Sequence, residues 1–220
     1  MNRDRRLAGV GGIAFAVSLV IGFTFFGPKG GHYSAAEIAA FVGQGPTALI
    51  ASVYLFAVSI IGWIVLMAYL SEAWLHHGCH GRVAWGTSLL AAASVLIGWA
   101  LYLALPIAVL SGGPAVDPAT SYAIVSAGFV VLFGVGGVLL GIALLALALG
   151  GNAVPTWVRA LSGLAGLSAL FSWAFLIATG WSPNQWLPVP FYVVVLWGVV
   201  IGIWLLVSTP EPEATRMVDR

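Results

Sequence analysis

Charged residues are scarce in this chain. Asp, Glu, Lys and Arg make up 7% of its 220 residues, whereas a soluble globular domain has about a quarter. Apolar residues reach 61%, so the composition predicts a membrane protein without a sizeable water-soluble domain. The formal net charge is +1 and no run of basic residues occurs, which argues against a nucleic-acid-binding surface.

Cysteine is nearly absent, and nucleotide-binding motifs are missing. Cys79 is the single cysteine, so an internal disulfide framework is excluded. The chain contains neither a P-loop motif nor a glycine-rich dinucleotide fingerprint between a strand and a helix. We therefore expect no cofactor.

No Asp, Glu, Lys, Arg or His lies in the interior of the long apolar stretches; Arg159 is at the start of the segment 158–180. Such residues usually mark proton relays, ion paths or voltage sensors when they lie within a bilayer. Their absence argues against a proton-coupled transporter, a pump or a charged pore. It also removes general acids and bases from the membrane interior, so the sequence predicts a protein that is not an enzyme.

Apolar segments fill most of the chain. A hydrocarbon core about 30 Å thick needs about twenty apolar residues in a helix. Six segments meet or approach that length: residues 7–26, 46–70, 85–110, 120–149, 158–180 and 191–207. They predict an all-α bundle of six transmembrane helices over residues 7–207, preceded by a cytoplasmic segment 1–6 and followed by a polar cytoplasmic tail 208–220.

Two capping patterns refine this layout. Ser34 and Glu37 have capping-box spacing, which predicts a short interfacial helix over residues 34–42 in the first outer loop. That helix is either a lid on the bundle or a docking element for an outside partner. Asp117 followed by Pro118 is typical of the N-cap and first residue of a helix.

The basic residues set the orientation. With six spans, one side collects seven of the eight Lys and Arg residues, and Lys29 alone lies on the other. Both termini are therefore expected to be cytoplasmic. The basic residues on the predicted inner side are Arg3, Arg5, Arg6, Arg82, Arg159, Arg216 and Arg220.

The segment 120–149 carries an ordered series of small residues. Four of them recur every seven positions, and Gly137 forms a G-x-x-x-G pair with one of these. Helices in lipid associate through close packing at small residues, so this segment is expected to be the packing hub of the bundle. The same pattern also suits an oligomer interface. The series is Ala127, Gly134, Gly141 and Ala148.

A histidine-rich loop follows the second segment. His76 and His80 would share a helix face, with His77 and Cys79 beside them, so the loop is a candidate metal site. The alternative is that these histidines complement the dipole at a helix C-terminus, with Gly78 as the C′ residue.

A group of aromatic residues with polar tips is the candidate ligand cavity. Each O–H or N–H needs a partner within the membrane, and together the rings could line a pocket for an apolar or amphipathic molecule. The alternative is ordinary core or lipid-facing packing. The group is Tyr54, Trp99, Tyr102, Trp173 and Trp197.

The layout resembles uncharacterised six-span membrane proteins of high-GC Gram-positive bacteria, loosely similar to the DUF4386-type families. The matching features are the Arg-rich start leading into residues 7–12, the segment 34–41, Asp117–Thr120, residues 155–161 and Trp197. This resemblance implies a multi-pass protein of a bacterial plasma membrane. It implies no activity, and the histidine cluster departs from the basic turn usual at that place.

These observations lead to three functional hypotheses. The first is a non-enzymatic integral membrane protein that acts through contacts with lipid, a partner protein or a second copy of itself. The alternative is a small carrier or binding protein for an uncharged apolar compound. The third is a metal-binding or redox membrane component that uses the histidine loop.

Overall fold

The structure is a computed structural model, and it describes residues 3–26, 46–75, 79–112, 117–150, 155–178 and 189–208. Nearly all of these residues are helical, and the described ranges contain no strand. The helices are α1 (Arg3–Phe26), α3 (Pro46–Leu75), α4 (His80–Leu110), α5 (Pro118–Phe129), η1 (Val130–Val135), α6 (Gly136–Leu149), α7 (Thr156–Ala178) and α8 (Val189–Val207). The all-α prediction is confirmed for these residues.

Within the described ranges, four stretches are long and apolar enough to cross a membrane: Arg3–Gly22, Ile50–Glu72, His80–Leu101 and Ser126–Leu149. The segment Phe191–Val207 is a shorter apolar helix. Helices satisfy their own backbone hydrogen bonds, which is the condition for placing a single segment in lipid. The chain is therefore a helical bundle whose apolar helices indicate membrane insertion. The predicted interfacial helix at residues 34–42 lies outside the described residues, as does the tail from residue 209.

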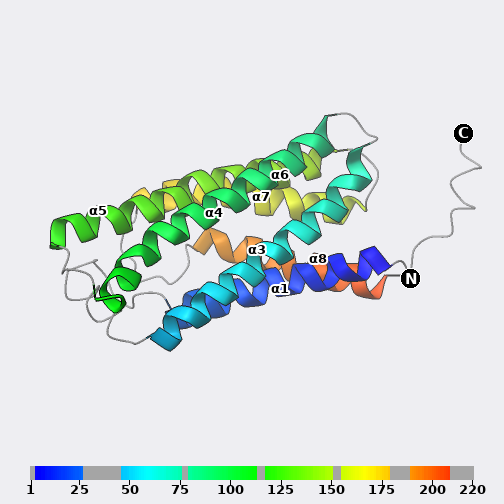
Figure 1. Cartoon of the computed structure of the whole chain (residues 1–220). Coiled ribbons are helices and arrows are strands. Elements are labelled where there is room, and N and C mark those ends of the chain that lie inside the picture. Colours follow the sequence, from blue (N-terminus) through cyan, green and yellow to red (C-terminus); the bar gives the residue numbers. More distant parts are fainter. Residues whose placement is uncertain are drawn as a thin grey trace, which may run out of the picture.

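The bundle is a ring of helical rods in chain order. Because α5, η1 and α6 follow one another without a break, they form one rod. Contacts run from α1 to α3, α3 to α4, α4 to α6, α6 to α7, α7 to α8 and α8 back to α1, and α3 also touches α6 across the ring. In Figure 1, α1, α3 and α8 group along the lower side of the bundle and α4, α6 and α7 along the upper side.

Two helix starts show how the ends are built. Asp117 is the N-cap of α5, as predicted, because its Oδ1 accepts a hydrogen bond from the Thr120 amide at 3.0 Å. The first helix, by contrast, begins at Arg3, before the predicted residue 7. The segment 3–6 is thus part of α1. One reason is that Asp4 in the first turn suits the positive end of the helix dipole.

Glycines hold the ring together at four of its six contacts. A Cβ atom built on Gly62 of α3 would lie 2.5 Å from the carbonyl oxygen of Gly11, so α1 and α3 approach backbone to backbone. The same is true of Gly202 against Gly9, where the distance is 2.7 Å. The corresponding contacts on the other side of the ring join Gly98 to Gly128 at 2.7 Å and Gly141 to Gly166 at 2.9 Å.

These contacts define two hub helices rather than the single hub predicted from the sequence. Through its glycines, α1 packs against α3 on one face and α8 on the other, and the α5–η1–α6 rod packs in the same way between α4 and α7. Each hub carries the sequence Gly-Val-Gly-Gly, at residues 9–12 and at residues 134–137. The repeat therefore lies on two helices with equivalent packing roles.

The predicted small-residue series is broken by the π-helical segment η1. Gly137 and Gly141 face α7, Ala148 contacts Gly163, and Gly134 is buried, but Ala127 is exposed. A π turn hydrogen-bonds from residue i+5 to residue i and so holds one residue more than an α turn, as in the bond from the Gly136 amide to the Val131 carbonyl.

The extra residue changes which small residue faces α4. Gly128 and Gly136, eight positions apart, both face α4, although a regular helix repeats after about seven. Placing Ala127 in the packing seam was therefore wrong.

Candidate functional site

The axis of the ring contains a cavity of about 40 Å³. Its walls come from α1, α3, α4, α8 and the middle of the η1–α6 rod, which is where the two hub helices face each other across the bundle. The lining residues are Phe15, Leu19, Phe56, Ser59, Ile60, Trp63, Ala91, Ala92, Val95, Leu132, Phe133, Leu140 and Phe191. None of these described lining residues has a titratable side chain.

Five of the thirteen described lining residues carry aromatic rings. The ring centroids of Phe15 and Trp63 are 5.2 Å apart. Phe133, which η1 contributes, meets Phe191 edge to face at 5.7 Å. Such offset and perpendicular arrangements are the favoured geometries of aromatic pairs. Rigid rings cannot close every gap at the axis, so a void remains between them.

Two lining side chains carry polar hydrogens. The Ser59 hydroxyl, on α3, donates a hydrogen bond to the carbonyl oxygen of Phe15 on α1 at 3.0 Å. The Trp63 indole N–H points to the carbonyl oxygen of Ser88 on α4 at 3.4 Å. Ser59 and Trp63 are 2% and 3% exposed. The described part of the wall is thus apolar apart from the Trp63 N–H and the Ser59 hydroxyl, which also ties two helices together.

The predicted aromatic group surrounds this cavity only in part. Tyr54 is 69% exposed and lies on the outer face of α3, because it is two positions from the inward-facing Phe56 and the helix turns about 100° per residue. Placing Tyr54 in the cavity was therefore wrong. The side chains of Tyr102 and Trp173 lie outside the described part of the structure.

Trp99 and Trp197 are buried just behind the cavity wall. The ring of Trp99 stacks on Phe56 with centroids 3.7 Å apart. Trp197 lies 5.9 Å from Trp63, and its N–H donates to the Ser162 hydroxyl at 2.9 Å. Neither is among the lining residues, so both support the wall rather than form it.

Sequence reasoning missed the aromatic residues that do line the cavity, such as Phe15 and Phe133. They have no polar tip, and an isolated Phe in an apolar helix looks the same whether it faces lipid or the interior. One usable signal was present. Phe15 lies one helical turn after Gly11 and Gly12 of the first Gly-Val-Gly-Gly segment, on the side of the helix that these glycines mark as inward-facing.

The histidine loop is described only at its end. His76 and His77 lie outside the described residues, Cys79 is exposed, and His80 is half-buried at the start of α4. In the described ranges, no three His, Cys, Asp or Glu side chains come together as a metal site would require. The metal hypothesis therefore stays a prediction for the loop.

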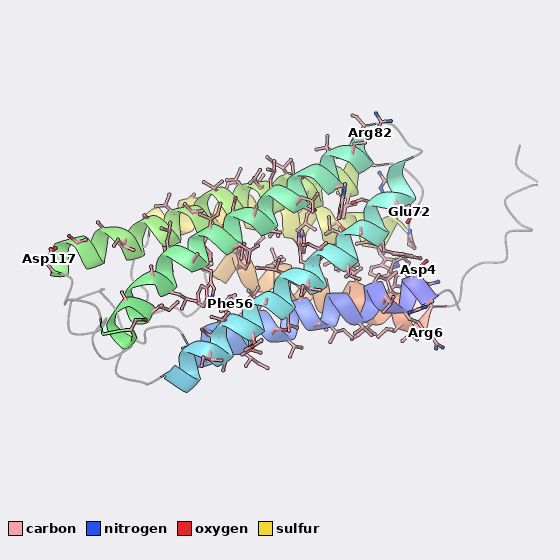
Figure 2. All side chains as sticks on the ribbon, in the orientation of Figure 1. Asp4, Arg6, Phe56, Glu72, Arg82 and Asp117 are labelled. Carbon is pink, nitrogen blue, oxygen red and sulfur yellow. The ribbon has the colours of Figure 1, made fainter. Side chains whose placement is uncertain are left out.

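Arginines cap two helix C-termini at one end of the bundle. Arg5 of α1 donates to the Ser208 hydroxyl after α8 and lies over the Trp204 ring, 5.6 Å from its centroid. Arg159 of α7 donates to the carbonyl oxygen of Ala148 in α6 at 3.1 Å. Both cations meet the negative end of a helix dipole. This end also carries Arg6 and Arg82, whereas Asp117 lies at the opposite end (Figure 2).

Comparisons with family models, with curated proteins and with solved structures found no match to this chain. The resemblance to six-span bacterial proteins therefore stays a prediction.

Proposed function

We propose that the chain is a six-span membrane protein, not an enzyme, that binds an uncharged apolar molecule in its central cavity. One observation carries this proposal: aromatic and aliphatic side chains line the cavity, and the described wall holds a single hydroxyl group and no charge. Ligand sites are typically concave and apolar with few polar groups. A wall of this kind can hold a nonpolar molecule, but its described residues offer no acid or base, and its hydroxyl has no general base beside it for activation.

The proposed orientation places both termini in the cytoplasm of a bacterial cell, with the protein in the plasma membrane. Supporting this, Arg5 and Ser208 join the start of α1 to the end of α8, so both ends of the described chain lie at one end of the bundle. The basic residues at that end favour the cytoplasmic side. The plasma membrane and the bacterial source rest on the family resemblance.

The single exposed cysteine tests this orientation without any substitution. Cys79 lies between α3 and α4 at the arginine-rich end. A membrane-impermeant maleimide is expected to label it in inside-out vesicles and to leave it unlabelled in intact cells. Labelling in intact cells would reverse the proposed orientation.

Xenon is a suitable probe of the cavity because apolar cavities in proteins stay dry and bind it. We expect the ¹²⁹Xe resonance in detergent solution to shift when the protein is added, relative to empty micelles. The variant Ala92→Leu fills the cavity and should abolish the shift, because Ala92 lines it and is 5% exposed. Its matched control is Ala93→Leu on the exposed face of α4, which should keep the shift.

Equal xenon shifts in these two folded variants would refute binding in the cavity. The hypothesis of action through a partner protein or a second copy stays a prediction, because no feature of the described residues favours a particular partner.

A further inference from the structure

Ser59 is the hydroxyl-bearing residue among those that line the cavity. A hydroxyl group has one hydrogen to donate and two lone pairs that accept. Its hydrogen is committed to the Phe15 carbonyl at 3.0 Å. Tying α3 to α1 in this way explains the donor, but it leaves the acceptor capacity of the same oxygen unexplained.

The rest of the described wall supplies no donor to that oxygen. The other polar hydrogen of the lining side chains, on Trp63, is directed at the Ser88 carbonyl. Apart from Phe191 in the first turn of α8, the lining residues lie beyond the first turn of their helices, where backbone N–H groups are bonded along the helix. Among the described lining side chains, the cavity therefore offers a hydrogen-bond acceptor and no available donor.

We propose that the cavity selects an otherwise apolar molecule that carries a hydroxyl group, which donates its hydrogen to Ser59 Oγ. This rests on the proposed binding function and names the chemical class of its ligand. A carbonyl compound of the same shape would place its acceptor oxygen against the Ser59 oxygen. A buried acceptor without a donor is costly, so sites built for one hydrogen-bonding pattern reject isosteres that lack it.

The size of the cavity sets the probes. One water needs about 10–15 Å³ by this measure of volume, so a cavity of about 40 Å³ takes a molecule of three or four heavy atoms. Isobutane, 2-propanol and acetone share a branched shape with four heavy atoms. Isobutane has no polar group, 2-propanol has a hydroxyl donor, and acetone has a carbonyl acceptor.

The test is displacement of xenon by each of the three probes, followed by ¹²⁹Xe NMR. In the wild-type protein, we expect 2-propanol to displace xenon at a concentration about threefold to tenfold lower than acetone, since a net hydrogen bond contributes about that factor. Ser59→Ala should remove this preference and leave displacement by isobutane unchanged. The control Ser88→Ala, a buried serine bonded within its own helix, should keep the preference.

The outcomes separate the two proposals. If xenon binds and all three probes displace it, but acetone equals or exceeds 2-propanol, hydroxyl selection is wrong and the apolar cavity stands. If Ser59→Ala weakens xenon displacement by 2-propanol and by isobutane to the same extent, the serine acts only through packing and hydroxyl selection is again refuted. If neither xenon nor any probe binds the wild-type protein, the binding function itself fails. The comparison of alcohol with ketone in the wild-type protein requires no variant to fold.

Discussion

The contact between Gly62 and Gly11 gives the sharpest test of how this bundle is held together. We expect Gly62→Ala to destabilise the protein relative to Gly86→Ala. A Cβ on Gly62 would lie 2.5 Å from the Gly11 carbonyl oxygen and 2.8 Å from the Phe15 nitrogen, whereas a Cβ on Gly86 would meet nothing within 4 Å. The atoms near Gly62 are backbone atoms, so a side-chain rotation cannot make room.

The size of the effect follows from how far α1 and α3 must separate. Relieving the clash moves α1 and α3 apart by about 0.5–1 Å. Each pair of atoms in contact across the two helices then loses a quarter to a half of its attraction of ~0.1–0.2 kcal/mol. For about forty atom pairs along the seam the loss is about 2 kcal/mol, within the usual range for overpacking of about 1–3 kcal/mol. Alanine is favoured over glycine in a helix by about 0.5–1 kcal/mol, and this gain is common to both variants.

The assay is thermal denaturation of both variants in the same detergent, followed by far-ultraviolet circular dichroism. A difference of about 2 kcal/mol corresponds to a midpoint about 4–8 °C lower for Gly62→Ala in a chain of this size. Gly163→Ala is a second control, in which the added Cβ would make an ordinary contact of 3.5 Å with Ala148. Equal midpoints for the variants at residues 62 and 86 would show that close backbone approach does not hold α1 to α3.

Three further predictions concern other parts of the bundle. Deleting Val130 should convert η1 into regular helix and preserve the fold. Deleting Ile142, which is equally exposed but lies in regular helix, should rotate the rest of α6 by about 100° and prevent folding. Size-exclusion chromatography would distinguish the folded from the unfolded variant. Arg5→Gln should lower the unfolding free energy by about 0.5–2 kcal/mol, because the cation at the end of α8 is lost. Arg6→Gln, at an exposed position, should change the unfolding free energy little. Equal effects of the two variants in denaturation would contradict this. Trp197→Phe should cost about 1–3 kcal/mol, because the buried Ser162 hydroxyl loses its donor and the smaller ring leaves a gap.

The sequence predicted the helices well because their ends carry local chemical signals. Asp117 and Pro118 mark the start of α5 through a cap that needs no tertiary context. Apolar composition and length marked the segments themselves. The glycines at 137 and 141 were recognisable as packing residues because helices in lipid associate through close packing at small residues.

The inward face of each helix could not be predicted from the same information. In a soluble protein the polar face of a helix shows which side is exposed, but here lipid-facing and core-facing residues are both apolar. Tyr54 and Phe56 illustrate the problem: they are two residues apart and similar in type, yet Tyr54 is 69% exposed and Phe56 is 1% exposed. Their difference is set by where α1 and α4 pack, which a single sequence does not state.

The cavity follows from the two kinds of contact around the ring. At four seams, glycines bring neighbouring backbones together and leave no space. At the α3–α4 and α7–α8 seams the bridging groups are indoles, with Trp63 reaching the Ser88 carbonyl and Trp197 the Ser162 hydroxyl.

A ring of six rods has a wider axis than a four-helix bundle, and large side chains extend into it. Phe15, Phe133 and Phe191 fill most of that axis, but rigid rings in tilted and perpendicular pairs do not tile completely. The void is therefore a consequence of closing six helices with glycine on the hubs and aromatic residues between them. Its chemistry depends on the Ser59 hydroxyl, which α3 places in the described part of its wall.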